Sequence, residues 1–399
     1  MTLWIIEPRD PLIFGDGKPF TAIPGSRAKS LPFPYPSTIA GCVRTRAGQD
    51  PASGRFDKRR IRELLGVDVR GPLLVEIDAM DRQEVVTDWL LPAPADALLL
   101  EAKTPDCALR RKLSPLELPS GCVTDLAGLS VVGASSPVKE KPHPHAPRYW
   151  RWDAYLQWLR APADGLTQLA TLGHDGPARE SRVHVSIEAR NQTALEGALF
   201  QTSGMEFVRS EPSHDEHKLA RSRTLALAVE TEASLTDGLD FMGGERRVVR
   251  WRHTEAGLPA CPDDVRANIV AQRACRMILL TPAHFQAGCL PSWALSKTTG
   301  VRVEVVGAAV PRYGAVSGWD YVTGKPKPAR RLAPAGSVYF LSLRGDPVAL
   351  GRFVDAIWMQ VVSDDLSGIE DGEQARRDGF GLAIAGAWDG ALSHLEVKP

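Results

Sequence analysis

One stretch near the N-terminus decides the local fold, and it reads Leu31-Pro32-Phe33-Pro34-Tyr35-Pro36-Ser37-Thr38-Ile39-Ala40-Gly41-Cys42-Val43-Arg44-Thr45-Arg46. Its three prolines alternate with other residues, which excludes a helix there and favours an extended lead-in. Ser37 follows the last proline and offers a hydroxyl as N-cap. Apolar residues then recur at helical spacing, at Ile39, Ala40, Val43 and Ala47. We therefore predict a short helix with its N-terminus at the surface.

This predicted helix could bind an anion, because the amide groups of a helix N-terminus suit a phosphate. Arg44 and Arg46 leave the helix on faces other than the apolar one and would add positive charge. A capped surface helix that binds nothing explains the same residues. Taken alone, the pattern favours this second interpretation, because most helix caps bind no ligand.

The composition is that of a soluble globular protein. The chain has 399 residues, which predicts two or three domains, and it is 43% hydrophobic and 24% charged. The formal net charge is +0, so no global field attracts nucleic acid or a membrane, and any polyanion site must be a local patch.

Targeting and redox signals point to a cytoplasmic protein. The acidic residues Glu7 and Asp10 come too early for a signal peptide, and no apolar run reaches the length of a membrane span. The six cysteines show neither metal-ligand spacing nor a disulfide framework. We expect no cofactor and no metal.

Along the chain, short strands outnumber helices. Residues 182–189 alternate apolar and polar side chains, which predicts a half-buried strand, and 346–362 has helical spacing. Residues 105–147 are rich in Pro, Gly and Ser, and we expect an insertion with little regular structure there. The predicted class is α+β with mostly antiparallel sheets.

Each half of the chain has a glycine turn beside arginines. The first is Gly243-Gly244 with Arg246 and Arg247, and the second is Gly379-Phe380-Gly381. Arg330 and Arg331 lie in a basic, proline-broken loop. The pattern suggests a degenerate duplication of a βαββαβ unit and suits an extended polyanion held by its backbone.

No constellation supports a catalytic assignment. A phosphate loop of the NTPase kind is absent, and Gly379-Phe380-Gly381 has no third glycine at Rossmann spacing. His214 and His217 could hold a metal, but their polar segment favours an exposed linker. We therefore predict no catalytic residue.

Several motifs occur in an order that strongly resembles subunit three of the Cmr module, a type III-B CRISPR effector subunit of the RAMP superfamily. They begin with Glu7-Pro8-Arg9-Asp10 and the segment 30–41, and they run to the closing stretch 379–386. Between these lie Asp16-Gly17-Lys18-Pro19-Phe20, Gly243-Gly244-Glu245-Arg246-Arg247, Leu279-Leu280-Thr281-Pro282, Ser317-Gly318-Trp319-Asp320 and Pro334-Ala335-Gly336-Ser337-Val338-Tyr339-Phe340.

The resemblance implies two ferredoxin-like (RRM-like) βαββαβ domains with large insertions and glycine-rich loops. We expect the first over residues 1–262, with an insertion near 100–180, and the second over 263–399. It also implies a non-catalytic antiviral-defence subunit that grips the 5′ handle of the CRISPR RNA and meets target RNA indirectly. Its protein partners would be the large polymerase/cyclase-like subunit and the filament RAMP subunits of the Cmr complex, with no membrane involved.

The resemblance also implies which residues contact RNA. Ser37 and Thr38 would meet phosphates, glycines would let the RNA backbone approach, and arginines would flank those loops. The length and position of the 105–147 insertion, rather than the resemblance, suggest that its basic run Arg110-Arg111-Lys112 reaches the guide–target duplex as a thumb. The full expected set is Lys18, Arg27, Lys29, Ser37, Thr38, Arg44, Arg46, Gly243, Gly244, Arg246, Arg247, Arg330, Arg331, Gly379 and Gly381.

Two alternatives stay open. One is a metal-independent endoribonuclease that processes precursor CRISPR RNA with Lys or Tyr, since the first histidine, His143, comes too late to match the N-terminal histidine of processing relatives. The other is an assembly scaffold that touches only protein.

Overall fold

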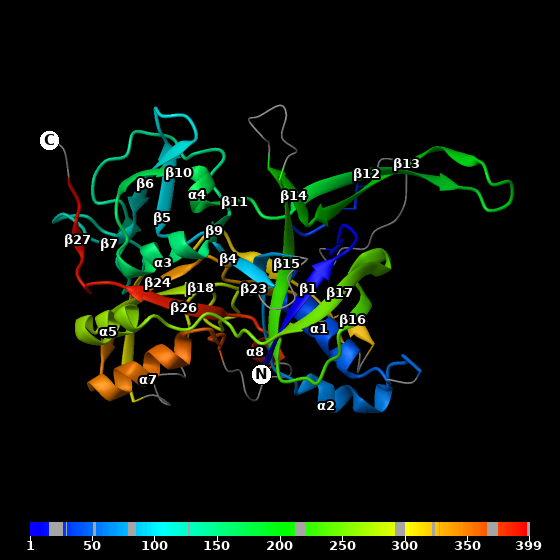
Figure 1. The fold of residues 1–399 in the computed structure, drawn as a ribbon. Coiled ribbons are helices and arrows are strands. Elements are labelled where there is room, and N and C mark those ends of the chain that lie inside the picture. The colour runs from blue at the N-terminus through cyan, green and yellow to red at the C-terminus, as the bar shows by residue number, and fades with distance from the viewer. Residues whose placement is uncertain are drawn as a thin grey trace. The chain divides into compact units, whose positions relative to one another are not determined.

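The computed structural model describes the chain except residues 16–26, 29, 51–52, 79–84, 127, 212–220, 292–299, 321–323, 327, 365–373 and 397–399. It divides into two compact units, each built from separate stretches of chain (Figure 1). The first unit comprises 1–87, 176–257 and 315–330, and the second comprises 88–175, 258–314 and 331–399. The domain boundaries predicted from the sequence stay a prediction.

The first unit is built on an antiparallel sheet with the order β3-β15-β1-β17-β16. The central strand β1 is buried over Leu3, Trp4, Ile5 and Ile6. The strands are β1 (Thr2–Pro8), β3 (Val69–Ile77), β15 (Arg221–Thr231), β16 (Gly238–Met242) and β17 (Arg247–Thr254), and β14 (Val208–Glu211) pairs with β15.

Helix α1 (Pro36–Ala47) lies in the connection between β1 and β3 and packs against β3. Ile39, Ala40 and Val43 are fully buried, which confirms the predicted apolar face. The predicted N-cap is wrong: Tyr35 holds that position without a side-chain cap, and Pro36 is the first helical residue. Proline suits this position, because its φ is already helical and the N–H it lacks would have no partner within the helix.

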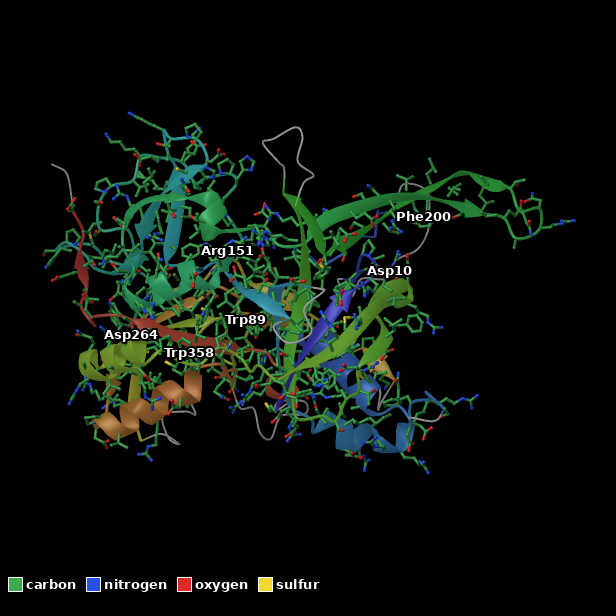
Figure 2. All side chains as sticks on the ribbon, in the orientation of Figure 1. Asp10, Trp89, Arg151, Phe200, Asp264 and Trp358 are labelled. Carbon is green, nitrogen blue, oxygen red and sulfur yellow. The ribbon has the colours of Figure 1, made fainter. Side chains whose placement is uncertain are left out.

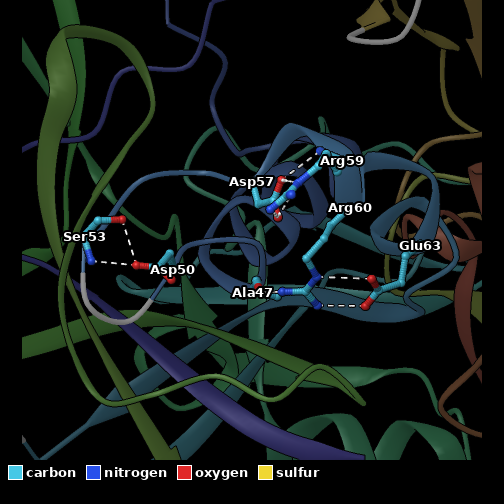
Figure 3. A network of polar contacts seen from close by, with 7 residues as sticks. All are labelled: Ala47, Asp50, Ser53, Asp57, Arg59, Arg60 and Glu63. Atoms are coloured by element: carbon cyan, nitrogen blue, oxygen red, sulfur yellow. Dashed lines mark hydrogen bonds and ion pairs between the residues drawn. The ribbon is translucent and has the colours of Figure 1, made fainter.

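The basic cluster after α1, residues 55–62, forms a solvated surface. It forms η1 (Lys58–Arg60) and α2 (Ile61–Leu65). Asp57 caps η1 and binds the Arg59 side chain, and this hydrogen bond lowers the pKa of the Asp57 carboxyl. Arg60 pairs with Glu63 at 2.7 Å and also donates to the carbonyl of Ala47 (Figure 3).

A long hairpin extends from the first unit, formed by β12 (Ala178–Ile187) and β13 (Ala194–Glu206), with β2 (Arg27–Ala28) parallel to β13 (Figure 1). The strand predicted at 182–189 is present as part of β12, but the prediction that its apolar face is buried is wrong. Val183, Val185 and Ile187 are exposed by 69%, 41% and 63%. Alternation shows which side chains share a face of a strand, but it does not show whether anything covers that face. On the other face His184 stacks on Phe200, which is labelled in Figure 2.

The second unit has a sheet with the order β19-β24-β18-β26-β25, again antiparallel. If β18, β19, β24 and β26 are numbered 1 to 4 along the chain, their order across the sheet is 2-3-1-4. In the first unit β1, β3, β15 and β17, numbered in the same way, have the same order across their sheet. The bounds are β18 (Ala274–Leu279), β19 (Arg302–Ala309), β24 (Val338–Arg344), β25 (Gln360–Val361) and β26 (Leu382–Ala387).

Helices cover the second sheet at β26, which contacts α3 (Trp152–Arg160), α5 (Asp263–Gln272) and α7 (Pro347–Ile357). Asp346 caps α7 by accepting from the Ala349 N–H at 2.9 Å. The helix predicted over 346–362 is therefore too long, because the chain turns at Trp358 and enters β25. Apolar spacing continues past the helix end, since the residues that follow are buried too.

The 105–147 segment contains more regular structure than the sequence predicted. It carries three strands, because the Pro- and Gly-rich turns separate short runs of apolar residues that pair locally. The strands and helix of residues 88–175 not yet named are β4 (Val86–Pro92, which begins in the first unit), β5 (Ala97–Glu101), β6 (Cys107–Lys112), β7 (Ser114–Glu117), β8 (Val132–Gly133), β9 (Tyr149–Arg151), β10 (Gly165–Gln168), α4 (Leu169–Leu172) and β11 (Gly173–His174).

The remaining short elements are β20 (Gly314–Val316), β21 (Trp319–Asp320), β22 (Lys325–Pro326), β23 (Arg330–Leu332), α8 (Gln374–Arg377) and β27 (Ser393–His394). None of the described helices is both long and apolar enough to cross a bilayer.

A buried ion pair joins residues 88–175 to the sheet of the second unit. Asp96 and Arg276 are both 1% exposed and lie 2.5 Å apart. Trp158 donates its indole N–H to Asp96 at 2.9 Å, while Arg276 donates to the carbonyls of Trp158 and Ala387. Each charge therefore has several hydrogen-bond partners, as a buried pair requires.

The glycine turn at the end of the second unit is held from inside. Gly379 and Gly381 have φ of 92° and 88° and are buried. The Thr281 hydroxyl donates to the Gly379 carbonyl and accepts from the Gly381 N–H. A Cβ at Gly381 would lie 2.7 Å from the backbone nitrogen of Ser363. Glycine is therefore required here by internal packing as well as by the positive φ.

Replacing Asp96 by Asn should strongly destabilise the protein, because it leaves the Arg276 charge buried without a counter-ion. We expect a loss of about 3–5 kcal/mol in the free energy of unfolding, measured by urea titration. The matched control is Asp264→Asn, which breaks the exposed Arg160–Asp264 pair and should cost less than about 1 kcal/mol. Equal losses in the free energy of unfolding would show that the buried pair stabilises the protein no more than the exposed pair does.

Gly381→Ala should destabilise the protein by about 1–3 kcal/mol, because alanine is strained at this φ and meets Ser363. Gly41→Ala is the control, since a Cβ at Gly41 would meet nothing within 4 Å and the backbone there is helical. This second variant should gain about 0.8–1 kcal/mol in a thermal melt. Stabilisation by both substitutions would contradict the internal role of Gly381.

Candidate nucleic-acid interface

The first glycine turn, residues 243–247, forms an exposed loop between β16 and β17 that we call the glycine loop. Gly243 has a φ of 73°, and a Cβ there would lie 2.5 Å from the carbonyl oxygen of Ile13. Gly244 donates its N–H to that same oxygen at 2.7 Å. The glycines therefore seat the loop directly on the backbone of Ile13.

The N-terminal motif lies beside this loop in the first unit. Arg9 donates its backbone N–H to the Val248 carbonyl, and the Asp10 carboxylate accepts from the Val248 N–H, both at 2.9 Å. Asp10 is labelled in Figure 2. The Phe14 N–H donates to the Ser30 hydroxyl at 3.0 Å, and the Leu31 N–H donates to the Phe14 carbonyl. Motifs more than 200 residues apart in the sequence therefore meet in one unit.

The two arginines of the glycine loop differ in their contacts. Arg247 pairs with Glu245 at 2.5 Å, and its side chain is 15% exposed. Arg246 lies with its guanidinium carbon 4.3 Å from the centre of the Phe241 ring, and it makes no ion pair with any residue that the structure describes. Among the described residues, no carboxylate therefore neutralises the charge of Arg246, whereas Arg247 is already paired.

The backbone of the glycine loop is strained where it carries these charges. Glu245 and Arg246 have φ of 58° and 50°, although neither is glycine. Such positions cost about 1–3 kcal/mol each and persist where the surroundings fix them. Here the contact of Gly243 and Gly244 with Ile13 supplies that constraint.

The arginines of α1 are engaged inside the first unit. Arg44 is buried and donates to the Val67 carbonyl at 2.8 Å. Arg46 pairs with Asp240 at 2.9 Å, donates to the Thr236 carbonyl, and lies over the Trp251 ring. Helix spacing alone could not reveal these acceptors, and the RNA contacts expected of Arg44 and Arg46 remain predictions.

The start of α1 carries half-buried Ser37 and Thr38. The Thr38 N–H donates to the Tyr35 carbonyl at 3.0 Å, and the Tyr35 hydroxyl donates to the Ala315 carbonyl at 3.2 Å. Lys18 and Lys29 lie outside the described residues, and Arg27 belongs to β2. The RNA contacts expected of these residues remain predictions.

The other expected residues do not belong to the glycine loop. Arg331 lies over the exposed Tyr313 ring in the second unit, and Arg330 is half-buried in the first. In the 105–147 segment, Arg111 pairs with Asp164 at 2.9 Å, and Arg110 lies over the Trp158 ring. The basic run of this segment is therefore bound within its own unit, and its role as a thumb remains a prediction.

Sequence reasoning missed Phe241, which is 51% exposed beside the loop arginines. The available signal was the period-two pair Leu239 and Phe241 directly before the glycines. The predicted site includes the glycines and arginines but not the strand that leads into them.

The Cys42 thiol of the first unit has a raised pKa. Burial first, and the Asp240 charge second, raise the pKa of the Cys42 thiol to about 12, while the Gly243 backbone hydrogen bond opposes this shift. Cys42 therefore stays a neutral thiol at physiological pH. Within the described stretches, no group of three or more His, Cys, Asp or Glu side chains converges as a metal site would require.

Comparison with known proteins gives one family and two structures to report. The family model described as CRISPR-associated protein (Cas_Cmr3) matches residues 4–388. A cryo-EM structure of the Type III-B Cmr-beta bound to cognate target RNA contains a chain that is 14% identical, with a TM-score of 0.44, and the match covers 85% of this chain and 86% of that one. A second structure, with AMPPnP also bound (state 1), gives 13% identity, a TM-score of 0.42 and the same coverage. Curated protein sequences give no match.

The family model spans nearly the whole chain, including the N-terminal motif, the glycine loop and the closing glycine turn. The chain therefore belongs to the family of CRISPR-associated Cmr3 proteins, which confirms the resemblance to subunit three of the Cmr module of type III-B CRISPR effectors.

Proposed function

We propose that this Cmr3-family chain is a non-catalytic, RNA-binding subunit of its type III-B effector. In this proposal it grips the 5′ handle of the CRISPR RNA, docks on the large polymerase/cyclase-like subunit beside the filament RAMP subunits, and serves antiviral defence in the cytoplasm. The observation that carries the RNA-binding role is the glycine loop, an exposed turn that presents the Arg246 charge to solvent. An exposed cation on a solvent-exposed turn suits a phosphate chain.

We infer that each unit contains a ferredoxin-like sheet. The order 2-3-1-4 with antiparallel neighbours, found in both units, is the order of a βαββαβ fold. The helices support this inference only in part. Helix α1 fills the first crossover of the first unit and α7 fills the second crossover of the second unit, whereas the connection from β15 to β17 carries β16 and η2 (Gly244–Arg246) instead.

The basic residues of the site are expected to act locally, because the chain has no net charge to attract RNA as a whole. Local phosphate contacts are measured by the salt dependence of binding, since each neutralised phosphate releases counterions. The glycine loop can therefore be tested separately from the rest of the surface.

Arg246→Ala combined with Arg247→Ala should weaken binding of a single-stranded RNA that carries the host repeat's 5′ handle. Each lost phosphate contact should lower the slope of log affinity against log salt by about 0.7 in a filter-binding titration. Arg246→Ala alone should give most of the effect, because Arg247 already pairs with Glu245.

The charge-matched control is Arg59→Ala combined with Arg62→Ala, which removes two exposed arginines from the same unit. The control should leave the slope unchanged. A slope that falls equally in both double variants, or in neither, would contradict a specific role for the glycine loop.

The non-catalytic role predicts that the purified full-length chain leaves repeat RNA intact. The assay is incubation with labelled repeat RNA in the presence of a metal chelator, followed by denaturing gel electrophoresis. A mock preparation, purified in the same way from cells that do not express the chain, reveals contaminating nuclease. Discrete cleavage products made only by the native chain would replace this proposal with the endoribonuclease function.

A further inference from the structure

An aromatic side chain lies exposed at the edge of the first sheet, next to the glycine loop. Phe241 and Leu239 are on the same face of β16, and they are 51% and 66% exposed. β16 is the last strand of its sheet. A large exposed aromatic ring needs an explanation, because burying such a ring in water-excluded contact is strongly favourable.

The position of Arg246 distinguishes this ring from an ordinary exposed side chain. Its guanidinium carbon is 4.3 Å from the ring centre, well within the range of a cation–π contact. The side chain is directed there by a backbone in the left-handed region at both Glu245 and Arg246. Since Gly243 and Gly244 seat this turn on Ile13, the arginine is held over the ring by the fold.

A guanidinium over a phenyl ring is a platform for a flat, electron-rich group. Nucleobases stack on aromatic side chains and on arginine planes, and such stacking tolerates any base because every base has a π face. The positive charge of Arg246 also favours a ligand that carries phosphate. Leu239 next to it offers apolar contact but no ring on which a base could stack.

We propose that one nucleobase of single-stranded RNA stacks on the Phe241–Arg246 pair while the adjacent phosphate lies against the glycine loop. This inference rests on the proposed RNA-binding function and deepens it by naming the part of the RNA that the site holds. A protein partner is the competing occupant of this surface. The charge on Arg246, which no described carboxylate neutralises, favours the polyanion.

The test uses the full-length chain and an oligoadenylate ten-mer that carries 2-aminopurine, whose fluorescence falls when it stacks. Phe241→Ala should weaken binding about 5- to 150-fold and abolish the fluorescence change. The salt slope should stay unchanged in this variant, because no phosphate contact is lost. Phe241→Tyr should keep both affinity and quenching.

Two further variants separate stacking from charge and from general apolar contact. Arg246→Lys keeps the charge but loses the planar group, so the salt slope should persist while quenching weakens. Leu239→Ala should change the affinity less than about twofold, since a base would gain little from leucine. Circular dichroism melting checks that each variant is folded, which is expected because both replaced side chains on β16 are exposed.

The inference is overturned if Phe241→Ala leaves affinity and 2-aminopurine fluorescence unchanged while Arg246→Ala combined with Arg247→Ala still lowers the salt slope. That result would leave the proposed function intact. If Phe241→Ala and Leu239→Ala weaken binding equally without a change in quenching, the surface is a general apolar contact and the inference is overturned as well. If no variant of the loop or of Phe241 affects RNA binding, the proposed function fails together with the inference.

Discussion

The contact between the Ile13 carbonyl and the backbone of Gly243 and Gly244 is the constraint on which the candidate interface depends. One oxygen accepts the Gly244 N–H and leaves no room for a side chain at Gly243. This contact joins the N-terminal motif to the turn between β16 and β17. The next two residues, Glu245 and Arg246, are in the left-handed region, and the Arg246 guanidinium lies over the Phe241 ring. Glycine is thus required for a steric reason, and the chemistry of the site follows from it.

The two glycine turns resemble each other in sequence but differ in their surroundings. Gly243 and Gly244 are exposed, whereas Gly379 and Gly381 are buried and bound to Thr281. The same residue pattern therefore serves an open loop in the first unit and a packed core in the second. Arginines differ in the same way, because Arg44 and Arg46 satisfy carbonyls and a carboxylate of their own unit while Arg246 faces solvent.

The sequence predicted the elements whose signal is local. The buried face of α1 follows from Ile39, Ala40 and Val43, which recur at helical spacing. The predictions that failed depended on what lies opposite an element. Val183 and Ile187 lie on one face of a strand, as predicted, but that face is exposed. The helix predicted over 346–362 extends past the end of α7 at Ile357, because apolar residues continue at helical spacing after it. In the candidate site, glycines and arginines were visible in the sequence, whereas the partners of Arg46 and the ring under Arg246 are set by tertiary contacts.

The buried pair of Asp96 and Arg276 has a consequence for how the chain is made. Its members are 180 residues apart in the sequence, so the carboxylate is synthesised long before its cation exists. During translation Asp96 must stay hydrated, and the second unit cannot close until β18 has left the ribosome. Both units are assembled from distant stretches, which places this protein among slowly folding, non-local topologies. A nascent chain that stops before residue 276 would therefore expose the surface that this pair later seals.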